Sequence, residues 1–161
     1  MNLREEGERI IRVGIDLDSV IMNWSYEIIN NSEEEFKILR EWAGPPPHKG
    51  KRDLICVTAR NAKKNLPVGY SGMEDAISTL NENNILFDEY YFIGGSHKFM
   101  TAYHIDYLVD DGPMIYERWV RHRDESKIIV FDAPENRHIN CTHRVKRLSE
   151  IIEIIESDWE E

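Results

Sequence analysis

The sequence is poor in cysteine, in long apolar runs and in net positive charge. Its two cysteines, Cys56 and Cys141, are too few to indicate a disulfide-stapled secreted fold. No apolar run is long enough to cross a bilayer, and the first residues lack the apolar core of a secretory signal. We therefore expect a cytoplasmic protein that does not associate with membranes.

The shortage of positive charge also limits the partners. Lysine and arginine total 20 against 30 aspartates and glutamates, which gives a formal net charge of −10. A dedicated nucleic-acid binder usually carries a basic surface, so nucleic acid is not an expected partner. Small phosphorylated substrates remain open, because a local cation can outweigh a distant net charge.

The chain of 161 residues, 41% of them hydrophobic, fits one domain, 1–161, with a substantial core. Apolar strand-like runs alternate with segments of helical spacing, which predicts an α/β fold: a Rossmann-like, parallel, five-stranded sheet with helices on both faces. The strands are expected at about 10–17, 53–58, 90–93, 107–109 and 127–131. Helices are expected as a pair within 22–43 and at 73–83, 98–104, 114–122 and 145–156.

The first strand ends in two carboxylates. Asp16 and Asp18 follow the apolar run 10–15, and strand alternation would point both to the same side. Like charges this close repel, but a divalent cation and phosphate chemistry would justify both. The alternative is a strand end that opens into a polar loop.

Three further polar residues follow other predicted strands: Thr58 after the second, and Asp110 and Asp111 after the fourth. In parallel sheets ligands bind at the carboxyl ends of the strands, so these side chains are expected to converge with Asp16. Singly, Thr58 can be read as a strand-end turn former, and the paired aspartates before Gly112 as a turn.

Together these motifs resemble the haloacid dehalogenase-like phosphohydrolases. That family has Asp-x-Asp after strand one, Ser or Thr after strand two, a lysine, and paired aspartates after strand four. Here the motifs read Asp16-Leu-Asp18, Val57-Thr58-Ala59-Arg60, Lys98, and Asp110-Asp111. The spacing from Lys98 to Asp110 and the later run 131–136 look more like the 5′(3′)-deoxyribonucleotidase branch and its bacterial and viral relatives. Ser19 departs from the pattern, since glycine is usual there.

The resemblance implies a Mg²⁺ site made by Asp16, Asp18, Asp110 and Asp111. Asp16 and Asp110 would bind the metal through their carboxylates and Asp18 through its backbone carbonyl. Asp111 would orient the metal shell or a bound water.

The resemblance also implies catalytic roles. Asp16 would attack phosphorus and form an aspartyl-phosphate, and Asp18 would act as general acid and then general base. Thr58 would donate its hydroxyl to a phosphoryl oxygen, and Lys98 would offset negative charge. The plain alternative for Lys98 is a solvated helix residue.

Substrate choice in this family lies in a cap inserted after the first motif, here expected as a short segment over 22–52. Within it Trp24 and Trp42 could stack on a nucleobase, or could simply pack the cap helices together. Ala59 and Arg60 are grouped with Thr58 and Lys98 as substrate-binding residues, although a solvated side chain is the simpler explanation for Arg60.

The expected function is a Mg²⁺-dependent phosphatase on small phosphomonoesters, in particular a 5′(3′)-(deoxy)ribonucleotidase on nucleoside monophosphates. The alternatives are a 3′-phosphatase on nucleic-acid ends, which the acidic charge disfavours, and a non-catalytic binding protein of the same fold. A homo-oligomer is compatible with the sequence, because short-capped members often close their site with a partner subunit.

Overall fold

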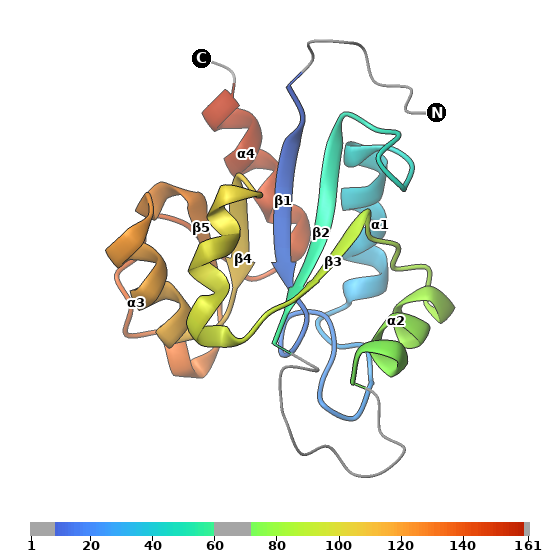
Figure 1. The fold of residues 1–161 in the computed structure, drawn as a ribbon, viewed down its shortest axis with the longest axis horizontal. Helices are drawn as coiled ribbons and strands as arrows, with labels where there is room; N and C mark the ends of the chain where they lie inside the picture. Colours follow the sequence, from blue (N-terminus) through green and yellow to red (C-terminus); the bar gives the residue numbers. More distant parts are fainter. Residues whose placement is uncertain (1–8, 60–71, 160–161) are drawn as a thin grey trace.

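The structure, a computed structural model, describes residues 9–59 and 72–159 and is built around a parallel β-sheet (Figure 1). Six strands pair in the order β3-β2-β1-β4-β5-β6, all in parallel. They are β1 (Ile11–Asp16), β2 (Arg52–Thr58), β3 (Glu89–Phe92), β4 (Tyr107–Asp110), β5 (Ile128–Phe131) and β6 (Arg144–Val145). The predicted parallel α/β, Rossmann-like architecture is confirmed.

The predicted number of five strands is wrong. The sixth strand, β6, has two residues, of which Arg144 is half-buried and Val145 is buried. A two-residue strand shows no alternation in the sequence, and only its pairing with β5 defines it.

The connections between strands are helical. The α-helices are α1 (Ser32–Ala43), α2 (Gly72–Glu82), α3 (Pro113–His122) and α4 (Ile151–Trp159). Short 3₁₀-helices are η1 (Gly95–Tyr103), η2 (Glu125–Lys127), η3 (Pro134–Asn136) and η4 (Leu148–Glu150). Three expected helices differ: 22–31 forms turns and isolated bridges, and the helix expected at 98–104 is the 3₁₀-helix η1. The helix expected at 145–156 begins only at Ile151, because its first residues belong to β6 and η4. None of the described helices has the length and apolarity that a membrane crossing would require.

The alternation of strand side chains produces two cores, one on each face of the sheet. On one face Val13, Ile15 and Leu54 pack with residues of α1 and α4. On the other face Ile55 and Val57 pack with residues of α3. Both faces of the central strands are buried, which explains why β1 and β2 read as nearly continuous apolar runs.

The strand order sets the position of the candidate site. β1 lies between β2 and β4, so the chain crosses over from β3 to β4 and the direction of winding reverses between β1 and β4. In open α/β sheets ligands bind at the carboxyl ends of the strands at this reversal. Asp16 ends β1 and Asp110 ends β4, so both carboxylates lie at this point.

The segment expected as a cap, 22–52, contains the helix α1 and, before it, most of the loop 17–31. Phe36, Leu39 and Ala43 of α1 belong to the same core as the strands, so α1 belongs to the layer that covers the sheet. Residues 17–31 follow the carboxyl end of β1 as a loop. This loop turns at Ser19, which has a positive φ of 68° and so adopts the conformation that glycine favours.

Candidate functional site

Three buried charged side chains meet at the carboxyl ends of β1 and β4. The Lys98 ammonium donates to Asp16 Oδ1 at 2.7 Å and to Asp110 Oδ2 at 2.8 Å. All three residues are at most 5% exposed. The sequence motifs from β1, η1 and β4 are therefore brought together, and the reading of Lys98 as a solvated helix residue is wrong.

Asp111 completes a group of carboxylates that could hold a metal ion. One oxygen from each of Asp16, Asp110 and Asp111 lies within 4.8 Å of the others. Mg²⁺ prefers oxygen ligands and is commonly held by one or two protein carboxylates with the remaining positions filled by water or substrate. The donor set and its spacing fit such an ion.

The charge of the cluster is unbalanced. Three carboxylates face one ammonium group, and without a cation two negative charges would be left uncompensated in a buried place. Burial raises the pKa of Asp16 well above its ordinary value, Asp110 raises it further, and Lys98 opposes this only in part. Burial also raises the pKa of the neighbouring Asp111.

Lys98 stays charged in this environment. Burial alone would lower the pKa of Lys98, but the carboxylates of Asp110 and Asp16 outweigh burial and raise it above the ordinary range. The ammonium is thus a fixed positive charge between two strand ends, where it can also face a phosphoryl group.

The loop after β4 is held by hydrogen bonds that fix both aspartates. Gly112 N–H donates to Asp110 Oδ1 at 2.9 Å. The side chain of the buried Asn136 donates to the Asp111 carbonyl at 2.9 Å and to the Phe131 carbonyl at 2.7 Å. Asn136 therefore holds the loop that carries Asp111. It is not among the site residues predicted from the sequence, although it lies in the run 131–136 that carries part of the resemblance.

Thr58 and Asp18 lie together beside this cluster. The Thr58 hydroxyl donates to Asp18 Oδ2 at 3.4 Å, and Thr58 is fully buried at the end of β2. Asp18 is half-buried and its side chain is not part of the three-carboxylate group. This position suits a group that exchanges protons with solvent or substrate better than a carboxylate that binds the metal.

The residues expected to bind substrate do not all lie near the carboxylate cluster. Trp24 lies on the loop after β1 and is 48% exposed. Trp42 is not brought to the site: its indole N–H donates to Glu156 at 2.6 Å and Arg52, the first residue of β2, stacks on its ring. Trp42 thus lies toward the amino ends of the strands. Ala59 follows Thr58 directly, and Arg60 lies outside the described residues.

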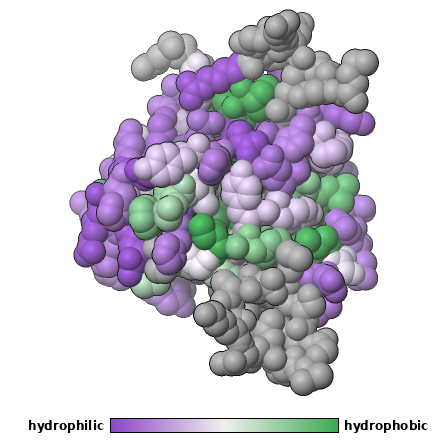
Figure 2. All heavy atoms as spheres, in the orientation of Figure 1, coloured by the Kyte–Doolittle hydropathy of each residue, from purple (hydrophilic) through white to green (hydrophobic). Residues whose placement is uncertain are grey.

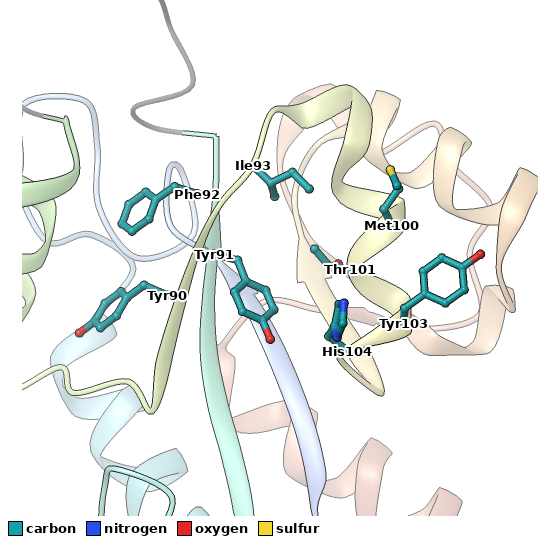
Figure 3. Close-up of a pocket in the computed structure, with 8 residues that line it drawn as sticks. All are labelled: Tyr90, Tyr91, Phe92, Ile93, Met100, Thr101, Tyr103 and His104. Carbon is teal, nitrogen blue, oxygen red and sulfur yellow. The ribbon is translucent and has the colours of Figure 1, made fainter.

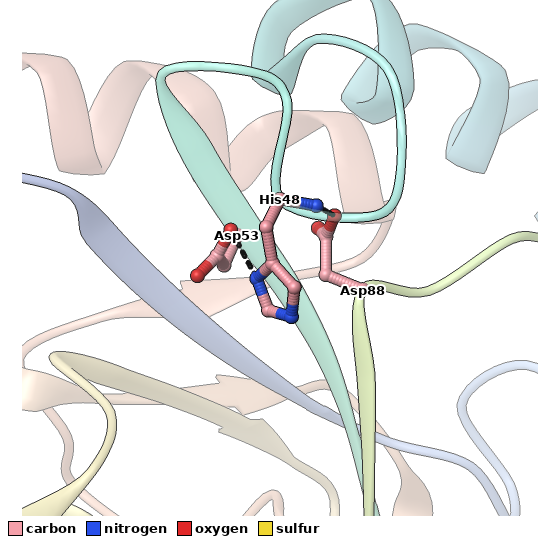
Figure 4. A group of neighbouring side chains, drawn as sticks. All are labelled: His48, Asp53 and Asp88. Carbon is pink, nitrogen blue, oxygen red and sulfur yellow. Dashed lines mark hydrogen bonds and ion pairs between the residues drawn. The ribbon is translucent and has the colours of Figure 1, made fainter. Parts of the chain in front are cut away.

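A second group with metal-like spacing was not predicted from the sequence. Ligand atoms of His48, Asp53 and Asp88 lie within 4.8 Å of one another (Figure 4). Asp53 lies near the start of β2 and Asp88 immediately precedes β3, so this group occupies the amino edge of the sheet, opposite Asp16.

The carboxylates of this amino-edge group already have strong partners. Arg12 donates to Asp53 at 2.9 Å and to Glu89 at 2.8 Å. Asp88 accepts from Arg40 at 2.9 Å and from the backbone N–H of Leu54 at 2.7 Å. With two guanidinium groups and backbone donors in place, the group is an ion-pair network that joins β1, β2 and β3.

The carboxyl-edge cluster therefore combines buried carboxylates, a buried ammonium group, a half-buried carboxylate and a buried hydroxyl donor. The three closely spaced carboxylate oxygens are ligands of the kind that a divalent cation takes. Comparison of the chain with protein-family models and with curated proteins finds no match in either case.

Proposed function

We propose that this protein is a Mg²⁺-dependent phosphatase that hydrolyses small phosphomonoesters through an aspartyl-phosphate. The observation that carries the proposal is the buried Lys98 ammonium that joins Asp16 and Asp110 at the point where the sheet reverses its winding. The Thr58–Asp18 pair at the same edge supplies the remaining groups that phosphoryl transfer needs.

Mg²⁺ would be held by Asp16 and Asp110, with Asp111 close to the same position. When bound, the ion supplies positive charge to the phosphoryl oxygens and favours the ionised form of the nearby carboxylates. Because burial raises the pKa of Asp16, a cation at this position would favour the ionised carboxylate that the mechanism needs.

In the first step an Asp16 carboxylate oxygen forms a bond to phosphorus while the bond from phosphorus to the ester oxygen breaks. Asp18 donates a proton to the departing oxygen, which leaves as an alcohol. In the second step the oxygen of a water molecule forms a bond to phosphorus while the bond from phosphorus to the Asp16 oxygen breaks. Asp18 takes a proton from that water, the Asp16 carboxylate is regenerated, and inorganic phosphate leaves.

Lys98 and Thr58 hold the phosphoryl group in place for both steps. The Lys98 ammonium is fixed by two carboxylates, so it requires little reorganisation to face the negative oxygens. Thr58 has no exposed surface and can redirect its hydroxyl from Asp18 to a phosphoryl oxygen once substrate enters.

Nucleoside monophosphates are the substrate class that we propose. The loop 17–31 follows the nucleophile directly and presents Trp24, which is 48% exposed and whose ring can stack on a base. Trp42 takes no part in this proposal, because it is held by Glu156 and Arg52.

Phosphate release from a panel of nucleoside monophosphates, sugar phosphates and p-nitrophenyl phosphate, with Mg²⁺ and with EDTA, tests the proposal. We expect Mg²⁺-dependent turnover that is highest on nucleotides. A preference for sugar phosphates would remove the nucleotide assignment alone. Absence of turnover on the whole panel would contradict the phosphatase assignment and favour a non-catalytic protein that uses the same cluster for binding.

A further inference from the structure

A cavity lies between the edge strand β3 and the 3₁₀-helix η1, on the face of the sheet that α3 also covers. It encloses about 610 Å³, a size that suits a small organic molecule. Tyr91 of β3 and Ile93, which follows this strand, point toward η1, whereas Tyr90 and Phe92 point away from it (Figure 3). Met100, Thr101, Tyr103 and His104 line the opposite wall.

The walls of this cavity are aromatic and in part exposed. Tyr91 and His104 meet edge to face with their centroids 6.3 Å apart, and Tyr103 is 72% exposed. Apolar atoms gather in the middle of this side of the molecule, over the region where β3 continues into η1 (Figure 2). A planar ring that entered here would find ring faces and the Met100 thioether as neighbours.

The polar groups of the cavity divide into satisfied and available ones. The Tyr91 hydroxyl accepts from Arg12 at 2.7 Å and donates to Glu89 at 2.9 Å, so this ring is held as a fixed wall. Thr101 donates to the Lys98 carbonyl at 2.6 Å. His104 is exposed, and within the described part of the chain its imidazole makes no hydrogen bond, so it can meet a polar edge of a ligand.

A guanidinium group lies against one of the aromatic rings that line the cavity. Arg123 stands over the Tyr103 ring, 4.0 Å from its centroid, and donates to the His122 carbonyl at 2.8 Å. Among residues 9–59 and 72–159 no carboxylate pairs with Arg123, and its buried Nε has no hydrogen-bond partner. In a chain with a net charge of −10, a cation without an acidic partner beside an aromatic cavity complements an anionic ligand.

We infer that this cavity binds a planar aromatic anion, with the ring between Tyr91, Tyr103 and His104 and the negative group on Arg123. The site is separate from the Asp16 cluster and does not rest on the proposed function. The two sites share η1, from which Lys98 reaches the carboxylates and Met100, Thr101 and Tyr103 line the cavity.

Three probes in EDTA separate the contributions of the ring and the charge. Adenosine 5′-monophosphate carries both, adenosine carries only the ring, and ribose 5-phosphate carries only the charge. We expect the monophosphate to bind more tightly than either, by ligand-observed NMR or calorimetry, and its affinity to fall as NaCl is raised.

Substitutions of the proposed contact residues test where the ligand binds. Because stacking on an aromatic side chain typically contributes a factor of about five or more to affinity, Tyr103→Ala and His104→Ala should each weaken the monophosphate about fivefold or more. Arg123→Gln should weaken the monophosphate, flatten its salt dependence and leave adenosine unchanged. The control Arg147→Gln removes an exposed charge near η4, on the other face of the sheet, and should change nothing.

The losses caused by Tyr103→Ala and Arg123→Gln should persist when Asp16 is also changed to Asn, which distinguishes this site from the catalytic cluster. The inference is overturned if the monophosphate does not bind, or if binding is lost in Asp16→Asn and kept in Tyr103→Ala. It is also overturned if sedimentation shows a dimer that Tyr103→Ala dissociates, since a second copy would then occupy the cavity. Both cavity side chains changed here are exposed, and unchanged thermal unfolding checks that the variants fold.

Discussion

The sheet carries a compact group of acidic side chains at the carboxyl ends of its strands (the carboxyl edge) and another at their amino ends (the amino edge). The two groups differ in the balance between acidic and basic side chains. At the carboxyl edge, Asp16, Asp110 and Asp111 share one ammonium, Lys98. At the amino edge, Asp53 and Asp88 are met by the guanidinium groups of Arg12 and Arg40. Both groups place ligand atoms within 4.8 Å of one another, so spacing alone does not separate them.

The difference shows that the partners of a carboxylate cluster decide what it can do. An arginine that lies against a carboxylate supplies the charge that a metal would bring, and backbone N–H groups fill the remaining lone pairs. At the amino edge the hydrogen bond from Arg12 lowers the pKa of Glu89. At the carboxyl edge burial and like charges raise the pKa of Asp16. One cluster is complete without a ligand, and the other has capacity for a cation.

The strongest way to break the comparison is Asp16→Asn. The amide is nearly isosteric but is a poor nucleophile for phosphorus and a weaker metal ligand, so turnover should fall by at least about a thousandfold. The fold should persist, because loss of one of several crowded charges relieves repulsion. Circular dichroism and steady-state phosphate release check both parts, and activity within about tenfold of wild type would contradict the covalent mechanism.

Arg12→Met tests the other edge. Asp53 is fully buried, and removal of one partner of a buried ion pair leaves an uncompensated charge. Because Arg12 itself is 25% exposed, we expect a loss of about 1–3 kcal/mol in the free energy of unfolding, measured with urea. The matched control Arg147→Met breaks an exposed pair with Glu150 and should cost less than about 0.5 kcal/mol. Equal effects would show that the amino-edge network contributes nothing special.

The two paired aspartates, Asp110 and Asp111, are expected to contribute unequally to Mg²⁺ binding at the carboxyl edge. Asp110→Ala should weaken Mg²⁺ more than Asp111→Ala, because Asp110 is buried beside Lys98 while Asp111 is half-buried. The loss for Asp111 should lie in the range of about 10–100-fold that is typical of residues that orient a metal ligand. The increase in Tm with added MgCl₂ reports these affinities, and the reverse order would exchange the two roles.

The smallest expected effect concerns Trp24. Its replacement by alanine should lower kcat/KM for nucleoside monophosphates by about fivefold or more, since stacking typically contributes about 1–3 kcal/mol, and should leave ribose 5-phosphate nearly unchanged. Trp42→Ala is the control, because Trp42 packs on Arg52 and should affect both substrates equally. Equal losses for Trp24→Ala would mean that its ring only supports the loop.

Much of the carboxyl edge is predictable because strand ends are visible in the sequence. Asp16, Thr58 and Asp110 each follow an apolar run, and parallel strands bring their carboxyl ends together. Lys98 joins this set only through a family resemblance, since nothing in its neighbours shows that it is buried.

The amino edge is invisible in the sequence for a physical reason. Asp53 and Asp88 depend on Arg12 and Arg40, which are 41 and 48 residues away along the chain, and long-range ion pairs leave no periodic pattern. The prediction that Trp42 lies at the site is wrong for the same reason. Its neighbours in the chain indicate a stiff turn, but its ring is held by Glu156, which is 114 residues away along the chain. Likewise, the spacing of the apolar residues in α1 predicts a helix, but it does not show whether that helix packs on the sheet or covers the candidate site.

The most direct test of the central claim is a count of bound Mn²⁺ by electron paramagnetic resonance, with Mn²⁺ standing in for Mg²⁺. Wild type should bind a single ion, which phosphate analogues retain and Mg²⁺ displaces. Asp16→Asn and Asp110→Asn should weaken that ion by at least about tenfold, while Asp53→Asn and Asp88→Asn should keep it provided that they fold. An ion that survives in Asp16→Asn and Asp110→Asn but is lost from folded Asp53→Asn would place the metal at the amino edge and contradict the account.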